Sequence, residues 1–309
     1  MEKRYPRTIM ATACIPWTED FRFDEMMFRR GVDLLLQGGV RSIYLFGTAG
    51  EGYAVNREQY TQIVTVFMDE MKSKPDSLPM VGVISLSMSE IIERISLGLS
   101  LGVQDFQISF PSWGAVSVEE GIGFLKTVCT HFPQARFLHY NNGLRSKTRL
   151  SMKDYVRLSE EVPNLAAVKN PGISLYELHD FHSRELPIEF FNLEFAFGFA
   201  SLINPTGLLI SLCDLNLKRA WDYFEAGSRR DAESINAIHR ELEVVDRIFN
   251  ENIPQGMIDS AYDKLLVKYH LPEFSQRLYP PYTGVSDEQF NKFAASLQKA
   301  LPGWAPCSS

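Results

Sequence analysis

The sequence is poor in cysteine, and its cysteines are widely separated. The 309 residues include only Cys14, Cys129, Cys213 and Cys307, and no two of them form a CxxC pair. This spacing argues against a disulfide framework and against a cysteine-based zinc site. We therefore expect a protein of a reducing compartment, the cytoplasm.

Long apolar runs and an excess of positive charge are also missing. No window approaches the roughly 18 uninterrupted apolar residues of a membrane helix. The apolar stretch from Ile9 to Ile15 is too short, and too interrupted by threonine, for a signal peptide. With 31 basic and 38 acidic residues the formal net charge is −7. This balance favours neither a nucleic acid nor an anionic membrane as a partner.

What the sequence does have is a regular alternation of strand and helix signals. The composition, 45% hydrophobic and 22% charged, suits a globular protein with a large core. Short β-rich apolar runs alternate with segments of helical period from residue 8 to about 225. Strands are expected at Ile9–Cys14, Ser42–Phe46, Met80–Ile84, Asp105–Ser109, Arg136–Tyr140, Leu165–Lys169, Glu189–Leu193 and Gly207–Ser211. Helices are expected near 24–37, 56–72, 87–101, 117–131, 151–160, 174–184, 198–204 and 215–227.

Eight strands and eight helices favour an α/β fold of the (β/α)₈ TIM-barrel type. A doubly wound open sheet is the alternative, because local periodicity does not show whether a sheet closes. Strand signals stop after residue 228, and amphipathic helices follow near 229–250, 255–269 and 287–300. We predict a barrel over residues 1–227 that carries the active site, and a C-terminal helical appendage over 228–309 packed on it.

Active sites of such barrels lie at the C-terminal ends of the strands. One unusual end is the segment from Gly47 through Thr48 and Ala49 to Gly52, which reads GTAGEG. Its glycines allow a sharp turn whose consecutive N–H groups can hold a carboxylate or phosphate. The spacing is neither GxGxxG nor a P-loop, so a small anion is a better ligand than a nucleotide. A tight turn that needs glycine for geometry alone is the alternative.

Two further strand ends carry Tyr140 and Lys169. Tyr140 closes the run LHY and, if it points inward, brings its phenol to the mouth of the barrel; a buried tyrosine that only packs is the alternative. Lys169 ends the small, apolar run LAAVK. An amine that loses solvation there is a Schiff-base candidate, because the neutral form attacks carbonyls. A lysine that reaches solvent or pairs with an acid is the alternative.

Together these three ends resemble the N-acetylneuraminate lyase and dihydrodipicolinate synthase superfamily. The resemblance implies class I aldolase chemistry, in which Lys169 forms an imine with pyruvate or a related 2-keto acid. It further implies that Tyr140 shuttles protons, that the Thr48 hydroxyl belongs to the proton relay, and that the turn at Gly47, Thr48 and Ala49 receives the carboxylate. It implies no metal and no organic cofactor, and a homotetramer built from dimers.

Several residues depart from the family pattern. The family usually has a second threonine where Ala49 stands, a change that keeps the N–H group. After the fourth strand the synthases carry a paired-tyrosine segment whose second tyrosine completes a relay, but this chain reads FPSW and ends the segment on Trp113. A tryptophan after proline in this loop resembles the sequence of hydratase-aldolases. Trp113 would then offer an apolar wall to a bulky substrate tail; a residue that only packs at the barrel rim is the alternative. Arg145 matches the arginine that grips a second carboxylate in the synthases.

The sequence therefore predicts a Schiff-base lyase or aldolase that makes or cleaves a carbon–carbon bond next to a 2-keto acid. A dihydrodipicolinate synthase-like condensing enzyme, or a hydratase-aldolase or hydro-lyase on the same scaffold, is the alternative within enzymes. A catalytically silent relative that binds a keto acid is the alternative outside them. The retained pair Lys169 and Tyr140 argues against silence, because folding alone does not require it.

Overall fold

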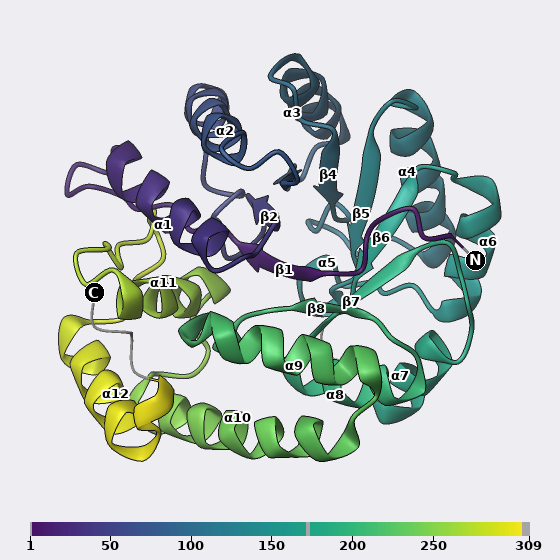
Figure 1. Ribbon diagram of the computed structural model, residues 1–309. Coiled ribbons are helices and arrows are strands. Elements are labelled where there is room, and N and C mark those ends of the chain that lie inside the picture. Colours follow the sequence, from purple (N-terminus) through teal and green to yellow (C-terminus); the bar gives the residue numbers. More distant parts are fainter. Residues whose placement is uncertain (1, 171–173, 305–309) are drawn as a thin grey trace.

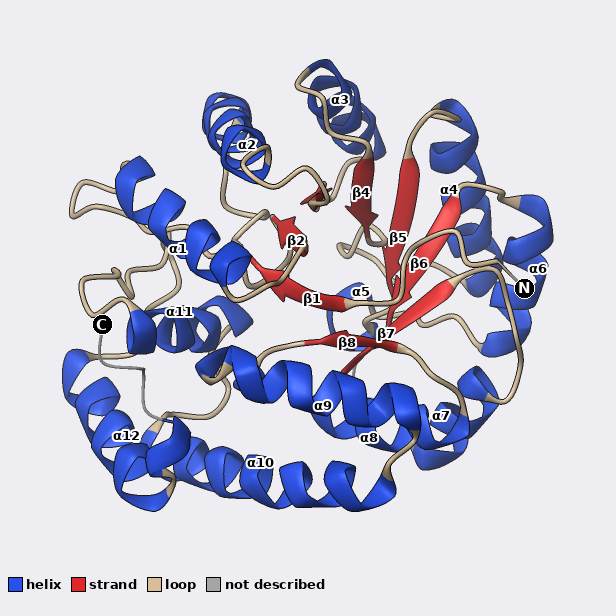
Figure 2. Cartoon of the chain, in the orientation of Figure 1, coloured by secondary structure: helices blue, strands red, loops and turns tan. Residues whose placement is uncertain are grey.

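The computed structural model describes residues 2–170 and 174–304. Eight parallel strands follow one another in chain order and close into a barrel, since β1 pairs with both β2 and β8 (Figures 1 and 2). They are β1 (Ile9–Thr12), β2 (Ser42–Leu45), β3 (Leu78–Gly82), β4 (Asp105–Ile108), β5 (Arg136–Tyr140), β6 (Leu165–Lys169), β7 (Glu189–Leu193) and β8 (Gly207–Leu209). The predicted TIM barrel is confirmed, and the open sheet is excluded.

Helices surround the barrel, as Figure 2 shows. They are α1 (Glu25–Gln37), α2 (Arg57–Met71), α3 (Met88–Ser100), α4 (Val118–His131), α6 (Met152–Glu161), α7 (Leu175–His182), α8 (Glu194–Ile203) and α9 (Leu217–Arg229). Several start at a capping residue; the Asn56 side chain, for example, accepts from the Gln59 N–H at the start of α2.

Two short helices and one helix start differ from the prediction. The one-turn α5 (Gly143–Ser146) and the 3₁₀ turn η1 (Leu212–Leu215) are too short to produce a helical period. Helix α8 begins at residue 194 rather than 198, because its first turn has no side-chain cap to mark it. The buried Glu194 carboxylate instead accepts hydrogen bonds from the backbone N–H groups of Ser211 and Cys213.

The barrel interior is a separate apolar cluster. Its buried members are Tyr5, Met10, Tyr44, Met80, Leu138, Ala166, Ala167, Phe191 and Leu209. At the N-terminal end of the strands the Tyr5 hydroxyl hydrogen-bonds Ser42 at 2.8 Å, and its ring packs edge-on against Phe191. This layer closes the N-terminal end of the barrel, so an interior pocket opens at the C-terminal end.

The C-terminal helices are α10 (Ala232–Asn252), α11 (Asp259–His270) and α12 (Asp287–Ala300), followed by the 3₁₀ turn η2 (Pro302–Trp304). They lie along one side of the barrel (Figure 1), where α10 contacts α8, α9 and α12. The structure thus has helices where the sequence predicts the appendage; the division at residues 227 and 228 stays a prediction. In the described part of the chain no helix is long and apolar enough to cross a membrane.

A buried ion pair ties α11 to the turn after β2. Lys264 of α11 pairs with Glu51, and neither side chain is exposed to solvent. Glu51 also accepts the Trp17 indole N–H at 3.0 Å and the Tyr279 backbone N–H at 2.8 Å. Because each of these partners belongs to a different part of the chain, the Glu51 carboxylate fixes α11 relative to the barrel.

We predict that Lys264→Met lowers the free energy of unfolding by about 3–5 kcal/mol, because it leaves a buried carboxylate without its counter-charge. The double variant Glu51→Gln with Lys264→Met should recover part of this loss, since no buried charge then remains. Urea denaturation measures both. Lys292→Met, which breaks an exposed i,i+4 pair on α12, is the control and should change stability by less than about 1 kcal/mol. A Lys264 variant as stable as this control would contradict the prediction.

Candidate active site

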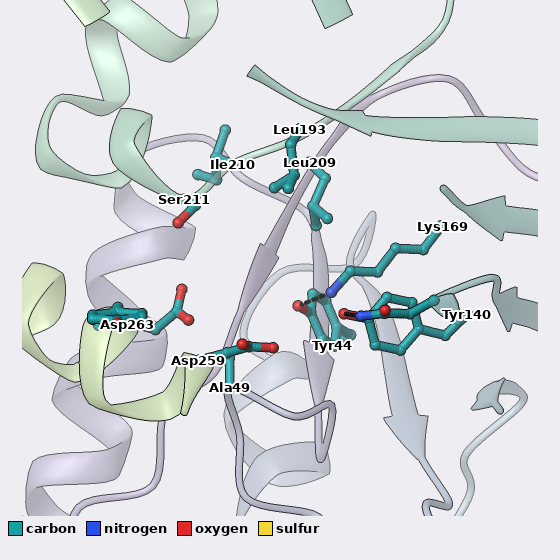
Figure 3. Close-up of a pocket in the computed structure, with 12 residues that line it drawn as sticks. Tyr44, Ala49, Tyr140, Lys169, Leu193, Leu209, Ile210, Ser211, Asp259 and Asp263 are labelled. Carbon is teal, nitrogen blue, oxygen red and sulfur yellow. Dashed lines mark hydrogen bonds between the residues drawn. The ribbon is translucent and has the colours of Figure 1, made fainter. Parts of the chain in front are cut away.

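A pocket of about 270 Å³ opens at the C-terminal end of the barrel. Strand ends and the loops after them supply one side, and α11 supplies the other (Figure 3). The lining residues are Tyr44, Ala49, Tyr140, Asn142, Lys169, Leu193, Leu209, Ile210, Ser211, Asp259, Tyr262 and Asp263. Of the residues singled out in the sequence, the pocket therefore brings together Lys169, Tyr140 and Ala49.

Lys169 ends β6 and is 7% exposed. Its Nζ donates a hydrogen bond to the Tyr44 hydroxyl at 2.8 Å (Figure 3). The same Nζ lies over the Tyr140 ring, 4.3 Å from its centroid, and 4.7 Å from the centroid of the Tyr44 ring. The amine is thus held between two aromatic faces, which stabilise a positive charge at this nitrogen.

Tyr140 ends β5 and turns its ring toward the pocket (Figure 3). Its hydroxyl accepts a hydrogen bond from the Asn142 Nδ2 at 2.7 Å. Burial raises the pKa of Tyr140, and the nearby charge of Lys169 opposes that shift. In the described residues no hydrogen bond joins Tyr140 directly to Thr48, and the relay that the family resemblance implies stays a prediction.

The turn after β2 presents free N–H groups. Thr48 and Gly47 use their carbonyl oxygens to accept from Glu51 and Gly52, at 3.1 and 3.2 Å. Among the described residues no acceptor faces the N–H groups of Thr48 and Ala49. Because Ala49 lines the pocket, these groups can hold a carboxylate there. Thr48 itself is buried and does not line the pocket.

Gly47 has a steric role in addition to its place in the turn. A Cβ atom at this position would lie 2.4 Å from Cε2 of Tyr44, a distance that carbon atoms do not tolerate. The ring of Tyr44 therefore occupies the space that a side chain at position 47 would need. The turn is also flanked by left-handed backbone at Phe46 and Glu51, with φ of 60° and 53°. Both residues are fully buried, which keeps them in this unfavourable conformation.

Like Gly47 and Thr48, the predicted site residues Trp113 and Arg145 lie outside the pocket lining. Trp113 is 85% exposed in the loop after β4, where its carbonyl oxygen accepts from Lys147 Nζ. Its ring therefore forms no wall of this pocket in the single chain, because the loop directs it into solvent. Arg145 on α5 donates to Asp259 of α11 at 2.7 Å. The guanidinium thus neutralises a carboxylate of the protein itself.

The pocket also contains residues that sequence reasoning missed. Asp259 and Asp263 project from one face of α11 toward the cavity (Figure 3). Their i,i+4 spacing was readable, but nothing in the sequence places this helix over the barrel mouth. Tyr44 was also missed, although alternation along β2 puts it on the same face as Ser42. In the described part of the chain no three His, Cys, Asp or Glu side chains gather into a metal site.

The Asp263 carboxyl binds its proton more tightly than an ordinary aspartate does. Burial raises the pKa of Asp263 to about 8, the neighbouring Asp259 carboxylate adds to the rise, and Lys169 opposes it. Among the described residues it has no hydrogen-bond partner from the protein, whereas Asp259 is paired with Arg145. The α11 side of the pocket therefore holds one neutralised carboxylate and one that carries a proton near neutral pH.

The sequence is similar to those of several known proteins. Residues 5–186 match the model of the dihydrodipicolinate synthetase family. A 4-hydroxy-tetrahydrodipicolinate synthase of Salinibacter ruber is 22% identical over 174 residues, 56% of this chain and 57% of that protein. An N-acetylneuraminate lyase of Gallus gallus is 24% identical over 173 residues, 55% of this chain and 56% of that protein. The matched region thus spans little more than half the length of these curated relatives.

Similarity to solved structures extends over nearly the whole chain. The crystal structure of YagE, a prophage protein of the dihydrodipicolinic acid synthase family from E. coli K12 in complex with pyruvate, superposes with a TM-score of 0.83. The match covers 95% of this chain and 98% of that one at 15% sequence identity. A dihydrodipicolinate synthase from Thermotoga maritima also gives a TM-score of 0.83, at 15% identity, covering 96% and 99% of the two chains.

We predict that the free energy of unfolding falls less steeply with rising pH in Asp263→Asn than in the wild type. The folded-state pKa of Asp263, about 8, lies above the ordinary value of 3.8. The folded protein therefore binds this proton more tightly than the unfolded chain does. The resulting stabilisation is complete below pH about 4 and disappears as the pH rises through about 8. Asparagine imitates the protonated form at every pH. The free energy of unfolding of the variant should therefore rise most, relative to that of the wild type, at alkaline pH.

Urea unfolding of both proteins from pH about 5 to about 9 measures this difference. The exposed variant Asp20→Asn serves as the control. Parallel stability curves for wild type and Asp263→Asn would contradict the assignment.

Proposed function

The chain belongs to the dihydrodipicolinate synthetase family, and on that premise we propose that it is a Schiff-base lyase or aldolase acting next to the keto group of pyruvate or a related 2-keto acid. The observation that carries the proposal is the buried Lys169 amine, which shares one pocket with Tyr140 and with the N–H groups of the turn at Ala49. Folding alone does not require a lysine and a tyrosine to face each other there.

Lys169 is the nucleophile in the proposed mechanism. The substrate carboxylate binds the free N–H groups of Thr48 and Ala49, which turns the adjacent keto carbon toward Nζ. The neutral amine adds to that carbon, and water leaves to give an iminium ion. The iminium accepts the electron pair of the carbon–carbon bond that breaks, as an enamine, and returns it when a bond forms. The aromatic faces of Tyr44 and Tyr140 stabilise the positive nitrogen.

Tyr140 acts after the imine has formed. Its raised pKa keeps it a neutral phenol at neutral pH, so it can donate a proton or hand one on between substrate oxygen and enamine carbon. The hydrogen bond from Asn142 orients the hydroxyl for this task.

The state of Arg145 supports cleavage over a synthase-type condensation. A synthase that grips a second carboxylate needs an arginine free to bind it, whereas Arg145 is paired with Asp259.

We further propose a homotetramer, a dimer of dimers, located in the cytoplasm. Exposed apolar side chains on α7 and α8 support a subunit interface; they are Leu175, Tyr176, Phe199 and Leu202. Cys14, Cys129 and Cys213 are free and buried, in keeping with a reducing compartment, and Cys307 lies outside the described residues.

We predict that borohydride reduction in the presence of pyruvate leaves a covalent adduct on Lys169. Peptide mass spectrometry locates the adduct, and Lys169→Arg, which keeps the charge, should abolish it. An adduct on another lysine, or none with any 2-keto acid in a panel of aliphatic, hydroxylated and arylidene compounds, would remove the proposed function. The second outcome would leave a silent keto-acid-binding relative as the explanation.

We predict that Tyr140→Phe still forms the adduct but turns over poorly. Loss of the phenol removes proton transfer worth roughly 10²–10⁴ in rate while leaving the nucleophile in place. Steady-state cleavage of the best 4-hydroxy-2-keto acid measures turnover, and borohydride trapping measures imine formation. Unchanged turnover would assign Tyr140 to packing alone.

A further inference from the structure

The phenol that touches the nucleophile comes from β2. The Tyr44 hydroxyl lies 2.8 Å from Lys169 Nζ, within hydrogen-bond distance. Tyr140 instead turns its ring face to the amine, and its own hydroxyl is bonded to Asn142 (Figure 3). Both rings therefore face Lys169, but of these two tyrosines only Tyr44 also contacts the amine through its hydroxyl oxygen.

The position of Tyr44 is fixed by the barrel itself. On β2, Tyr44 is paired with Thr12 of β1 on one side and with Met80 of β3 on the other. Its side chain is buried in the interior cluster. The absent side chain of Gly47 leaves room for its ring on one side. A rigid strand and a full steric contact thus hold the hydroxyl at the amine, whereas a loop residue would be free to move away.

Tyr44 is a neutral phenol in the resting protein. Burial raises its pKa, the Asp263 carboxyl adds to the rise, and a hydrogen bond from Thr12 opposes it. A neutral phenol has a proton to give, and it cannot serve as a base before the reaction begins.

We propose that Tyr44 is the general acid of imine formation, a catalytic residue distinct from Tyr140. This inference rests on the proposed function, because it needs a substrate carbonyl at Lys169. The carbon that Nζ attacks comes within bonding distance of Nζ, so the oxygen on that carbon lies close to the Tyr44 hydroxyl.

The step balances in atoms and charge. After the amine adds, the former keto oxygen is a hydroxyl on the carbinolamine carbon. Tyr44 gives its proton to that hydroxyl, the carbon–oxygen bond breaks, and water leaves. The nitrogen lone pair forms the C=N bond, so an iminium cation and a Tyr44 phenolate result side by side. When water later attacks the product imine, the phenolate takes a proton from it, and both the phenol and the free amine are restored.

The surroundings favour this ion pair over an isolated phenolate. In the buried site the iminium nitrogen is the Nζ of Lys169, which lies in contact with the Tyr44 oxygen. Opposite charges at hydrogen-bond distance attract strongly when water is excluded. Tyr44 can therefore lose its proton only as the iminium forms, which couples the two events.

The test measures imine formation apart from turnover. Wild type, Tyr44→Phe and Tyr140→Phe are mixed with pyruvate, quenched with borohydride at increasing times, and analysed by mass spectrometry for the adduct on Lys169. We expect Tyr44→Phe to form the adduct roughly 10²–10⁴ times more slowly than wild type, and Tyr140→Phe to form it at a rate near that of wild type. The phenylalanine keeps the ring next to Gly47 and its stacking on the amine, so the loss reports on the hydroxyl.

Tyr5→Phe is the matched control. Tyr5 belongs to the same interior cluster and its hydroxyl is also hydrogen-bonded and buried, but it lies at the opposite end of the barrel. This variant should trap at the wild-type rate. The pH profile of the trapping rate adds a readout that packing does not move: its shape should change in Tyr44→Phe and persist in Tyr5→Phe.

The outcomes separate the two claims. Absence of an adduct in the wild type would overturn the proposed function itself. Rapid adduct formation in the wild type and an equal rate and pH profile in Tyr44→Phe would overturn the role of Tyr44 and leave the Schiff base intact. If Tyr44→Phe fails to fold, as its melting curve would show, Tyr44→Met replaces it, and the same comparison applies.

Discussion

The buried pair between Glu51 and Lys264 is the contact on which the geometry of the site depends. Glu51 belongs to the turn that presents the free N–H groups, and Lys264 belongs to the helix that carries Asp259 and Asp263. A buried carboxylate and ammonium stabilise a fold little by their attraction alone, but they penalise every arrangement that separates them. The pair therefore specifies one placement of α11 over the barrel mouth, and with it the shape of the pocket.

Small residues on β6 leave room inside the barrel for the Lys169 side chain and for the rings that surround its amine. The run LAAVK gives β6 two alanines in the interior, so the long side chain of Lys169 lies where bulkier neighbours would exclude it. Large rings from β2 and β5 then close on the amine from two sides. The Lys169 amine is buried without losing electrostatic support, because aromatic faces and a phenol oxygen replace the water it gives up.

Much of the fold was predictable because it repeats. Each strand and helix produces its own period, and the count of eight leaves few topologies. Lys169 and Tyr140 were predictable for a related reason: they end strands, and strand ends share one rim. Tyr44 was not, because the distance across the barrel from β2 to β6 depends on closure, which no local pattern encodes. The carboxylates of α11 depend on the docking of a distant helix, and the outward turn of Trp113 depends on a loop without regular structure.

The pocket residues come from two separate parts of the chain, the barrel and α11, and this affects how the pocket can change during evolution. The groups that touch the Lys169 amine are on strands of the barrel, whereas Asp259, Tyr262 and Asp263 lie on one helix, α11, which the buried Lys264 anchors to Glu51. Substitutions at these three positions can therefore reshape the α11 side of the pocket while the strand residues around Lys169 stay in place. The pocket wall opposite the amine is thus encoded on a separate stretch of the gene and can vary apart from the barrel strands.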